Sequence, residues 1–201
     1  MDNEVVALQE LIAAGQNIVV FTGAGISTES GIPDFRGPQG VWKTQTPIDF
    51  SDFIGSEEWR RESWQRKFTG DNKMAKASPN SGHYAISHWA SIGKVSHVIT
   101  QNVDGLHQQS GIADEQITEL HGNANYASCL DCGKRYELTA IREAFLAEQR
   151  LPICNECTGI IKTATISFGQ AMPIEAMQRA ERATLDCDTF IAIGSSLTVY
   201  P

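Results

Sequence analysis

The sequence predicts an α/β fold in which a parallel sheet is covered by helices on both faces. Short apolar runs rich in β-branched residues alternate with helical segments along the 201-residue chain. Polar and glycine residues occur at the ends of four of these runs, at positions 22–27, 101–104, 121 and 194–196. Because ligands of open parallel sheets bind beyond the carboxyl ends of the strands, we expect these clusters to share one edge.

The first predicted helix begins at Asp2 or Asn3, either of which can cap it, and ends at Gly15. Its apolar face is formed by Val5, Leu8, Leu11 and Ile12. Strands are predicted at the apolar runs, which occupy residues 18–21, 95–100, 117–120, 163–167 and 189–193.

Three further helices are predicted from capping and charge. Acidic residues in the first turn favour a helix at residues 57–68. Ser78 as a cap, with Pro79 at the first helical position, favours a helix that runs to about residue 92. Another helix follows Pro173, and residues 37–55, rich in Gly, Pro and Thr, are predicted to form a loop.

The composition is typical of a folded protein, with 41% hydrophobic and 20% charged residues. No apolar run is long enough to cross a bilayer, so no membrane association is expected. The net charge of −8 argues against direct nucleic-acid binding. The acidic residues 1–4 lack a signal-peptide core, which predicts a cytoplasmic protein with reduced thiols.

The strand at residues 18–21 leads into the turn Gly23-Ala24-Gly25. Glycine lets the backbone approach a ligand closely, and the amides beyond such a turn form a cradle for phosphate. The usual dinucleotide fingerprint also needs a third glycine, where this chain has Thr28, and an acidic residue about twenty positions on. Asp49 lies near that distance, but in the predicted loop. The turn alone therefore predicts either an unusual nucleotide cradle or a tight strand–helix connection.

Four of the five cysteines form two Cys-x-x-Cys pairs, Cys129 with Cys132 and Cys154 with Cys157, separated by 21 residues. Two such pairs complete a tetrahedral zinc site, which we favour over a redox pair or packed thiols. Because four cysteines fill every position, the zinc is expected to be structural. Cys187 is expected to be buried. Residues 124–162 carry five basic and five acidic residues, so this module lacks the excess of positive charge that binds the phosphates of nucleic acid.

His121 differs from the other four histidines because it closes a predicted strand at the ligand-binding edge. At that position it can take a proton from a substrate hydroxyl near neutral pH, or it can make only a local hydrogen bond. Asn102 and Asp104 are likewise either ligand contacts or turn formers. His83 and His88 lie on a predicted helix and are expected to be structural.

Taken together, these residues resemble the sirtuin family of NAD-dependent protein deacylases. The matching motifs follow the family's order from residue 20 to residue 197, nearly the whole chain. They are GAGIS at 23–27, GIPDFR at 31–36, Pro79-Asn80 with His83, TQNVDGLH at 100–107, LHG at 120–122, both cysteine pairs, Phe168-Gly169 with Pro173, and GSSL at 194–197.

The resemblance implies that NAD is the co-substrate and lies across the strand ends. Its phosphates would lie at the 23–27 turn and its nicotinamide near residues 102–104, with Asp104 holding the carboxamide. Phe35, Arg36 and Gln101 would close the site. The implied cofactor-binding residues are Gly23, Ala24, Gly25, Ser27, Asp34, Phe35, Arg36, Gln101, Asn102, Val103, Asp104, Gly194, Ser195 and Ser196.

The resemblance also implies the reaction. The acyl oxygen of a modified protein lysine attacks the anomeric carbon of the nicotinamide ribose, and nicotinamide and O-acyl-ADP-ribose are released. His121 would be the general base that activates a ribose hydroxyl, and Asn102 the second catalytic residue. Phe168 and Gly169 would begin the segment that pairs with the substrate peptide as an added strand.

The implied fold is Rossmann-like with two inserts. Residues 1–36, 76–123 and 163–201 would form the NAD-binding domain, residues 124–162 the zinc-ribbon module, and residues 37–75 a helical and cofactor-loop insert. The family usually continues past the position of Pro201 with another strand, an asparagine segment and a closing helix. This domain is therefore expected to be incomplete at its C-terminal end.

Two further departures concern the substrate. Gln170 replaces an acid that many relatives carry after the Phe-Gly pair. Some relatives recognise acidic acyl groups with a Tyr-x-x-Arg pair, and this chain has Ser63 at the tyrosine position and Arg66 at the arginine position. A preference for succinyl groups is therefore doubtful, and Arg66 is the one residue that favours it. Two alternative functions remain: an NAD glycohydrolase or ADP-ribosyltransferase using the same pocket, and a non-catalytic NAD-binding or zinc-scaffold module.

Overall fold

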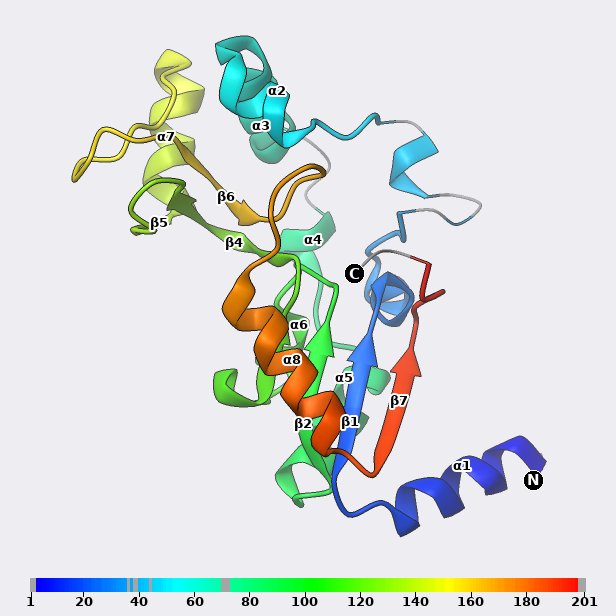
Figure 1. The fold of residues 1–201 in the computed structure, drawn as a ribbon. Coiled ribbons are helices and arrows are strands. Elements are labelled where there is room, and N and C mark those ends of the chain that lie inside the picture. The colour runs from blue at the N-terminus through cyan, green and yellow to red at the C-terminus, as the bar shows by residue number, and fades with distance from the viewer. Residues whose placement is uncertain (1–2, 36, 38–39, 44, 70–72, 199–201) are drawn as a thin grey trace.

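Four strands form a parallel sheet in the order β3-β2-β1-β7 in the computed structural model, which describes residues 3–35, 37, 40–43, 45–69 and 73–198 (Figure 1). They are β1 (Ile18–Thr22), β2 (Val95–Thr100), β3 (Ile117–Glu119) and β7 (Thr189–Ile193). Strand β1 lies between β2 and β7, and its residues Ile18, Val19 and Val20 have an exposed fraction of 0%. A strand buried on both faces explains the unbroken apolar run in the sequence.

Helices cover both faces of this sheet. On one face α5 (Ser81–Ser91) contributes Ile86 to a core that includes Ile18 and Val20. On the other face α8 (Ile174–Asp186) contributes Ala180 to a core that includes Val19. Figure 1 shows α8 in front of the sheet and α5 behind it. The predicted α/β architecture is confirmed.

A second, antiparallel sheet in the order β5-β4-β6 carries the cysteines. It consists of β4 (Gly122–Cys129), β5 (Arg135–Glu137) and β6 (Ile161–Thr165), with α7 (Leu138–Glu148) packed beside it. Helix α3 (Glu57–Thr69) joins the same core through Trp64, which stacks on Phe68, and Phe68 in turn contacts Phe145 of α7. The predicted helical insert and the cysteine-bearing module thus share one core.

The predicted loop at residues 37–55 contains two short helices, η2 (Val41–Lys43) and α2 (Phe50–Gly55). Helix α2 forms because Phe53 has a buried site to fill, where its exposed fraction is 2%. Composition alone cannot reveal such a tertiary contact. The remaining elements are α1 (Asn3–Ala14), η1 (Ala24–Ser30), α4 (Lys73–Lys76), α6 (Leu106–Gln109) and η3 (Asp114–Gln116).

The predicted cap of the helix at 78–92 is wrong by two residues, because Asn80 and not Ser78 caps α5. The Asn80 side chain accepts hydrogen bonds from the backbone amides of Gly82 and His83. Its amide group also donates to the carbonyl of Ile26, 2.8 Å away. This contact with the segment after β1 favours Asn80 over Ser78 as the cap.

Two smaller expectations also need correction. The apolar face predicted for the first helix is not buried: Val5, Leu8 and Leu11 of α1 are 46–49% exposed, and only Ile12 packs against the core. Cys187 is half-buried, not fully buried. Across the residues that the structure describes, none of the helices has the length and apolar character needed to cross a membrane.

Candidate functional site

The carboxyl ends of β1, β2 and β7 meet at one edge of the parallel sheet. Thr22, the last residue of β1, lies in register with Thr100 of β2 and Ile193 of β7. The backbone continues this pairing past the strand ends, since the amide of Gln101 donates to the carbonyl of Thr22 over 2.9 Å. The polar clusters that follow these three strands are therefore brought together, as predicted.

The glycine turn after β1 packs backbone to backbone against the turn after β7. The amide of Gly25 donates to the carbonyl of Gly194 over 2.8 Å. A Cβ atom at Gly25 would lie 2.7 Å from the Cα of Gly194, and one at Gly194 would lie 2.2 Å from the amide nitrogen of Ile26. Gly194 also has a φ of 66°, which favours glycine. These glycines keep the two loops in direct backbone contact.

Three buried polar side chains form one network at this edge. The hydroxyl of Ser27 donates to Asp104 Oδ2 over 2.7 Å, and the amide of Leu106 donates to Asp104 Oδ1 over 3.0 Å. Asn102 Nδ2 donates to Ser27 Oγ and to the carbonyl of Gly23. These hydrogen bonds hold the carboxylate and the amide in fixed positions.

His121 follows β3 and lies beside this network. Its Nδ1 is 3.0 Å from the carbonyl oxygen of Gln101. A carbonyl oxygen only accepts hydrogen bonds, so Nδ1 carries the proton and Nε2 of the neutral ring has a free lone pair. Burial lowers the pKa of His121, an effect partly opposed by the hydrogen bond to Gln101. The lowered pKa favours the neutral ring.

The segment after the glycine turn reaches the predicted peptide-binding segment through aromatic contacts. The ring centroids of Phe35 and Trp42 are 5.2 Å apart, and those of Trp42 and Phe168 are 5.1 Å apart. The amide of Phe50 also donates to the carbonyl of Phe168. The sequence did not point to Trp42, because only the tertiary fold brings it between Phe35 and Phe168.

Several other predicted site residues have individual positions. Ser195 joins the edge cluster by donating to Gln101 Oε1 over 3.0 Å, whereas exposed Ser196 pairs with Thr198. The Asp34 side chain accepts a hydrogen bond from the amide of Gly37 within its own turn. The predicted contact Arg36 lies outside the described residues.

The residues flanking the network and the peptide segment also have defined contacts. The carbonyl of Val103 accepts a hydrogen bond from the amide of Ala124, which connects the 101–104 cluster to β4. Gly169, with a φ of 76°, turns the chain after Phe168. The side chain of Gln170 accepts a hydrogen bond from the amide of Ser167, so it shapes this segment from within.

The four paired cysteines converge on one point. All four Sγ atoms of Cys129, Cys132, Cys154 and Cys157 lie within 4.8 Å of one another. Four thiolates at this spacing fit a single tetrahedral zinc ion. The hydroxyl of Tyr136 lies 3.1 Å from Cys154 Sγ, an outer contact that sequence reasoning missed. The set matches a structural site because it leaves no position for a reacting water.

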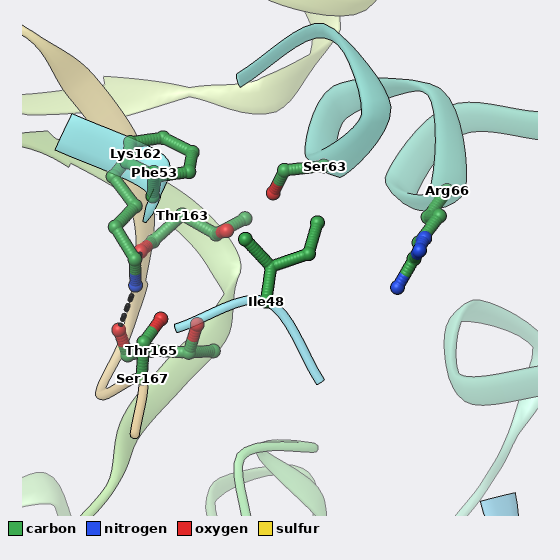
Figure 2. A pocket seen from close by; sticks show the side chains of 8 residues that line it. All are labelled: Ile48, Phe53, Ser63, Arg66, Lys162, Thr163, Thr165 and Ser167. Carbon is green, nitrogen blue, oxygen red and sulfur yellow. Dashed lines mark hydrogen bonds between the residues drawn. The ribbon is translucent and has the colours of Figure 1, made fainter. Parts of the chain in front are cut away.

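A pocket of about 200 Å³ lies between α2, α3 and β6 (Figure 2). Ser63 and Arg66 face it, but Arg66 is already paired with Glu62, with Nε 2.6 Å from the carboxylate. Lys162 also reaches this pocket and donates to the carbonyl of Thr165; burial lowers the pKa of Lys162 to about 8. The other lining residues are Ile48, Phe53, Thr163, Thr165 and Ser167.

Comparison with known proteins gives concordant matches. The model of the Sir2 family matches residues 23–201. An NAD-dependent protein deacetylase of Rhodopseudomonas palustris is 52% identical over 194 residues, which cover 96% of this chain and 77% of the relative. An NAD-dependent protein deacylase 2 of Archaeoglobus fulgidus is 38% identical over 202 residues, covering 100% of this chain and 78% of the relative.

Solved structures match equally well. A Sir2 complex with a p53 peptide and NAD⁺ superimposes with a TM-score of 0.84 at 34% identity, covering 97% of this chain and 77% of the other. A Sir2 structure bound to a propionylated peptide gives a TM-score of 0.84 at 31% identity, with coverage of 98% and 78%. The fold of this chain is therefore shared with these proteins.

Proposed function

Because this chain belongs to the Sir2 family, we propose that it removes acetyl or other acyl groups from protein lysines with NAD as co-substrate. The observation that carries the proposal is the tautomer of His121. Its Nδ1–H is held by the carbonyl of Gln101, which leaves Nε2 free to accept a proton.

Bound NAD would supply an anomeric carbon with nicotinamide as the leaving group, at which the acyl oxygen of the lysine reacts. The chain's own residues then have two tasks. The Ser27–Asn102–Asp104 network would orient the nicotinamide end, with the Asp104 carboxylate holding the carboxamide. His121 Nε2 would take the proton from a ribose hydroxyl, so that this hydroxyl can receive the acyl group.

The other parts of the cofactor would be held by backbone. The phosphates would lie at the 23–27 turn, where Gly25 and Gly194 bring the two loops together without side chains. Phe35, through Trp42 and Phe168, would cover the reacting ribose and connect it to the peptide segment at Phe168-Gly169. An acyl-lysine peptide would bind in an extended conformation and pair with this segment as an added strand, through main-chain hydrogen bonds.

These roles suggest which segments of the chain form each part of the protein. We assign NAD binding to residues 1–36, 76–123 and 163–201, zinc binding to residues 124–162 and the cofactor-loop insert to residues 37–75. Trp64 of the insert and Phe145 of the zinc module share one core, so these last two parts pack against each other. Zinc would be held by the four cysteines and would stabilise the fold without joining the reaction.

The decisive experiment incubates the 201-residue chain with NAD and an acetyl-lysine peptide and measures nicotinamide and deacetylated peptide together. Equal amounts of both products, formed only when the peptide is present, support deacylation. Nicotinamide formed without peptide would instead identify an NAD glycohydrolase. A folded sample that binds NAD but forms neither product would identify a non-catalytic binding module.

A further inference from the structure

A buried chain of hydrogen bonds lies directly beneath the strand ends. Thr22 and Thr100, opposite each other on β1 and β2, are 0% and 2% exposed. The hydroxyl of Thr22 donates to Thr100 Oγ1 over 2.8 Å, and the amide of Asn102 donates to the same oxygen over 3.0 Å. Thr100 therefore fixes the backbone of Asn102, a member of the network that would orient the nicotinamide end.

His107, on α6, extends this chain on the other side of Thr22. Its Nε2 lies 2.9 Å from Thr22 Oγ1. The hydroxyl proton of Thr22 is already directed to Thr100, so Thr22 Oγ1 must accept from His107, and Nε2 carries the proton. The opposite nitrogen, Nδ1, is then an acceptor; it is buried and has no hydrogen-bond partner among the described residues.

His83, on α5, offers the complementary atom. The backbone amide of Asn80 donates to His83 Nδ1, so the neutral ring carries its proton on Nε2. This Nε2–H is buried and also lacks a partner within the described part of the chain. The ring centroids of His83 and His107 are 5.1 Å apart. An unpartnered donor and an unpartnered acceptor thus belong to two adjacent rings.

We propose that His107 is a positioning residue, which sets Asn102 through Thr22 and Thr100, and that His83 Nε2–H holds His107 in the required tautomer by a hydrogen bond through one water. This inference rests on the proposed function only for the role of Asn102. The alternative is that both histidines merely fill space in the core. Burial lowers the pKa of both rings, to about 3 for His107, and the Asp104 carboxylate partly opposes this effect at His83.

The first test needs no substrate. Ring ¹⁵N chemical shifts of the full chain at pH 7.5 report the tautomer of each histidine. We expect Nε2–H for both His83 and His107. A charged ring, or an Nδ1–H tautomer of His107, overturns the proposal whether or not the protein turns out to be a deacylase.

The second test separates the hydrogen bond from the packing at position 107. His107→Gln keeps an N–H donor near the place of Nε2, whereas His107→Met fills a similar volume without one. If His107 positions Asn102, we expect His107→Gln to keep kcat for nicotinamide release within about 3-fold of wild type, and His107→Met to lose roughly 10–100-fold, as is typical of outer contacts that orient a reacting group. Equal losses in both variants overturn the proposal. His88→Gln, at an exposed site on α5, is the matched control.

The third test interrupts the same chain of hydrogen bonds at Thr22, and it remains usable if the variants at position 107 do not fold. Thr22→Val removes the hydroxyl between His107 and Thr100, and Thr22→Ser keeps it. We expect Thr22→Val to lower kcat by a factor similar to His107→Met and Thr22→Ser to keep kcat near that of wild type. The double variant Thr22→Val/His107→Met should have a kcat no lower than that of either single variant. If the fold-losses in kcat of the two single variants multiply in the double variant, or if Thr22→Ser loses as much kcat as Thr22→Val, the effects are independent packing effects and the proposal is overturned. If wild type does not turn over, NAD affinity is compared across the same variants with the same criteria.

Discussion

His121 Nδ1 lies 3.0 Å from the carbonyl oxygen of Gln101, the residue that directly precedes Asn102. This hydrogen bond determines which nitrogen of His121 carries the proton, and it connects the end of β3 to the end of β2. The proposed base and the proposed nicotinamide pocket are thereby held in one orientation.

Replacing His121 by Asn tests this arrangement. The Asn side chain can still donate to the carbonyl of Gln101, but it has no group that accepts a proton near neutral pH. We expect kcat for deacylation to fall roughly 10²–10⁴-fold, the usual contribution of a general base, with little change in melting temperature. Steady-state kinetics and a thermal melt measure both quantities. Full activity of His121→Asn would show that another group is the base.

The pH dependence of stability follows from the burial of His107, whose side chain is almost fully enclosed. Burial, reinforced by the neighbouring His83, lowers the pKa of His107 to about 3. The folded-state pKa lies below the ordinary value of about 6.5, so the unfolded chain binds more protons as the pH falls below that value. The free energy of unfolding should therefore decrease by about 2 kcal/mol between pH 7.5 and pH 5 from this residue alone.

Urea denaturation of wild type and His107→Gln at both pH values isolates this contribution. Between pH 7.5 and pH 5, the free energy of unfolding of the variant should decrease less than that of wild type, by about 2 kcal/mol. Glu119 acts in the opposite direction at the acid end, because burial raises its pKa, but it is common to both proteins. Parallel slopes in the two proteins would mean that His107 is protonated in the folded state.

Removal of zinc should disturb helix α3, although α3 contributes no cysteine. Trp64 is 2% exposed and packs in the same core as Cys129 and Cys154. Because a structural zinc site supplies folding free energy, a strong chelator should loosen this core and expose Trp64. Tryptophan fluorescence of wild type, compared with Trp64→Phe, reports the change. An unchanged Trp64 signal after confirmed metal loss would show that the module folds without the ion.

The contact between Gly25 and Gly194 predicts an unusual sensitivity to a single methyl group. In Gly25→Ala the new Cβ would lie 2.7 Å from the Cα of Gly194, so the two backbones must separate. We expect a loss of about 1–3 kcal/mol in unfolding free energy and weaker NAD binding. Gly55→Ala is the matched control, since a Cβ there meets nothing within 4 Å. Calorimetric titration with NAD distinguishes the two variants, and equal affinities would contradict the prediction.

Much of the fold could be predicted because its signals are local. The β-branched runs of β1, β2 and β7 mark strands, and the spacing of Cys129, Cys132, Cys154 and Cys157 marks a metal site whatever the rest of the chain does. The failures depend on tertiary contacts. Asn80 caps α5 because its amide also contacts Ile26, and α2 forms where Phe53 finds a buried position. The first helix has an apolar pattern, yet within the described residues most of that face is exposed.

The sequence by itself determined the family, the polar residues at the strand ends and the identity of the candidate base and metal ligands, because each of these depends on motifs that can be recognised along the chain. Only the tertiary structure decided that His121 carries its proton on Nδ1, that Gly25 packs on Gly194, and that His107 reaches Asn102 through two threonines. A tautomer and a backbone contact are set by the partner that the fold brings within about 3 Å, and that partner is often a residue far away along the chain.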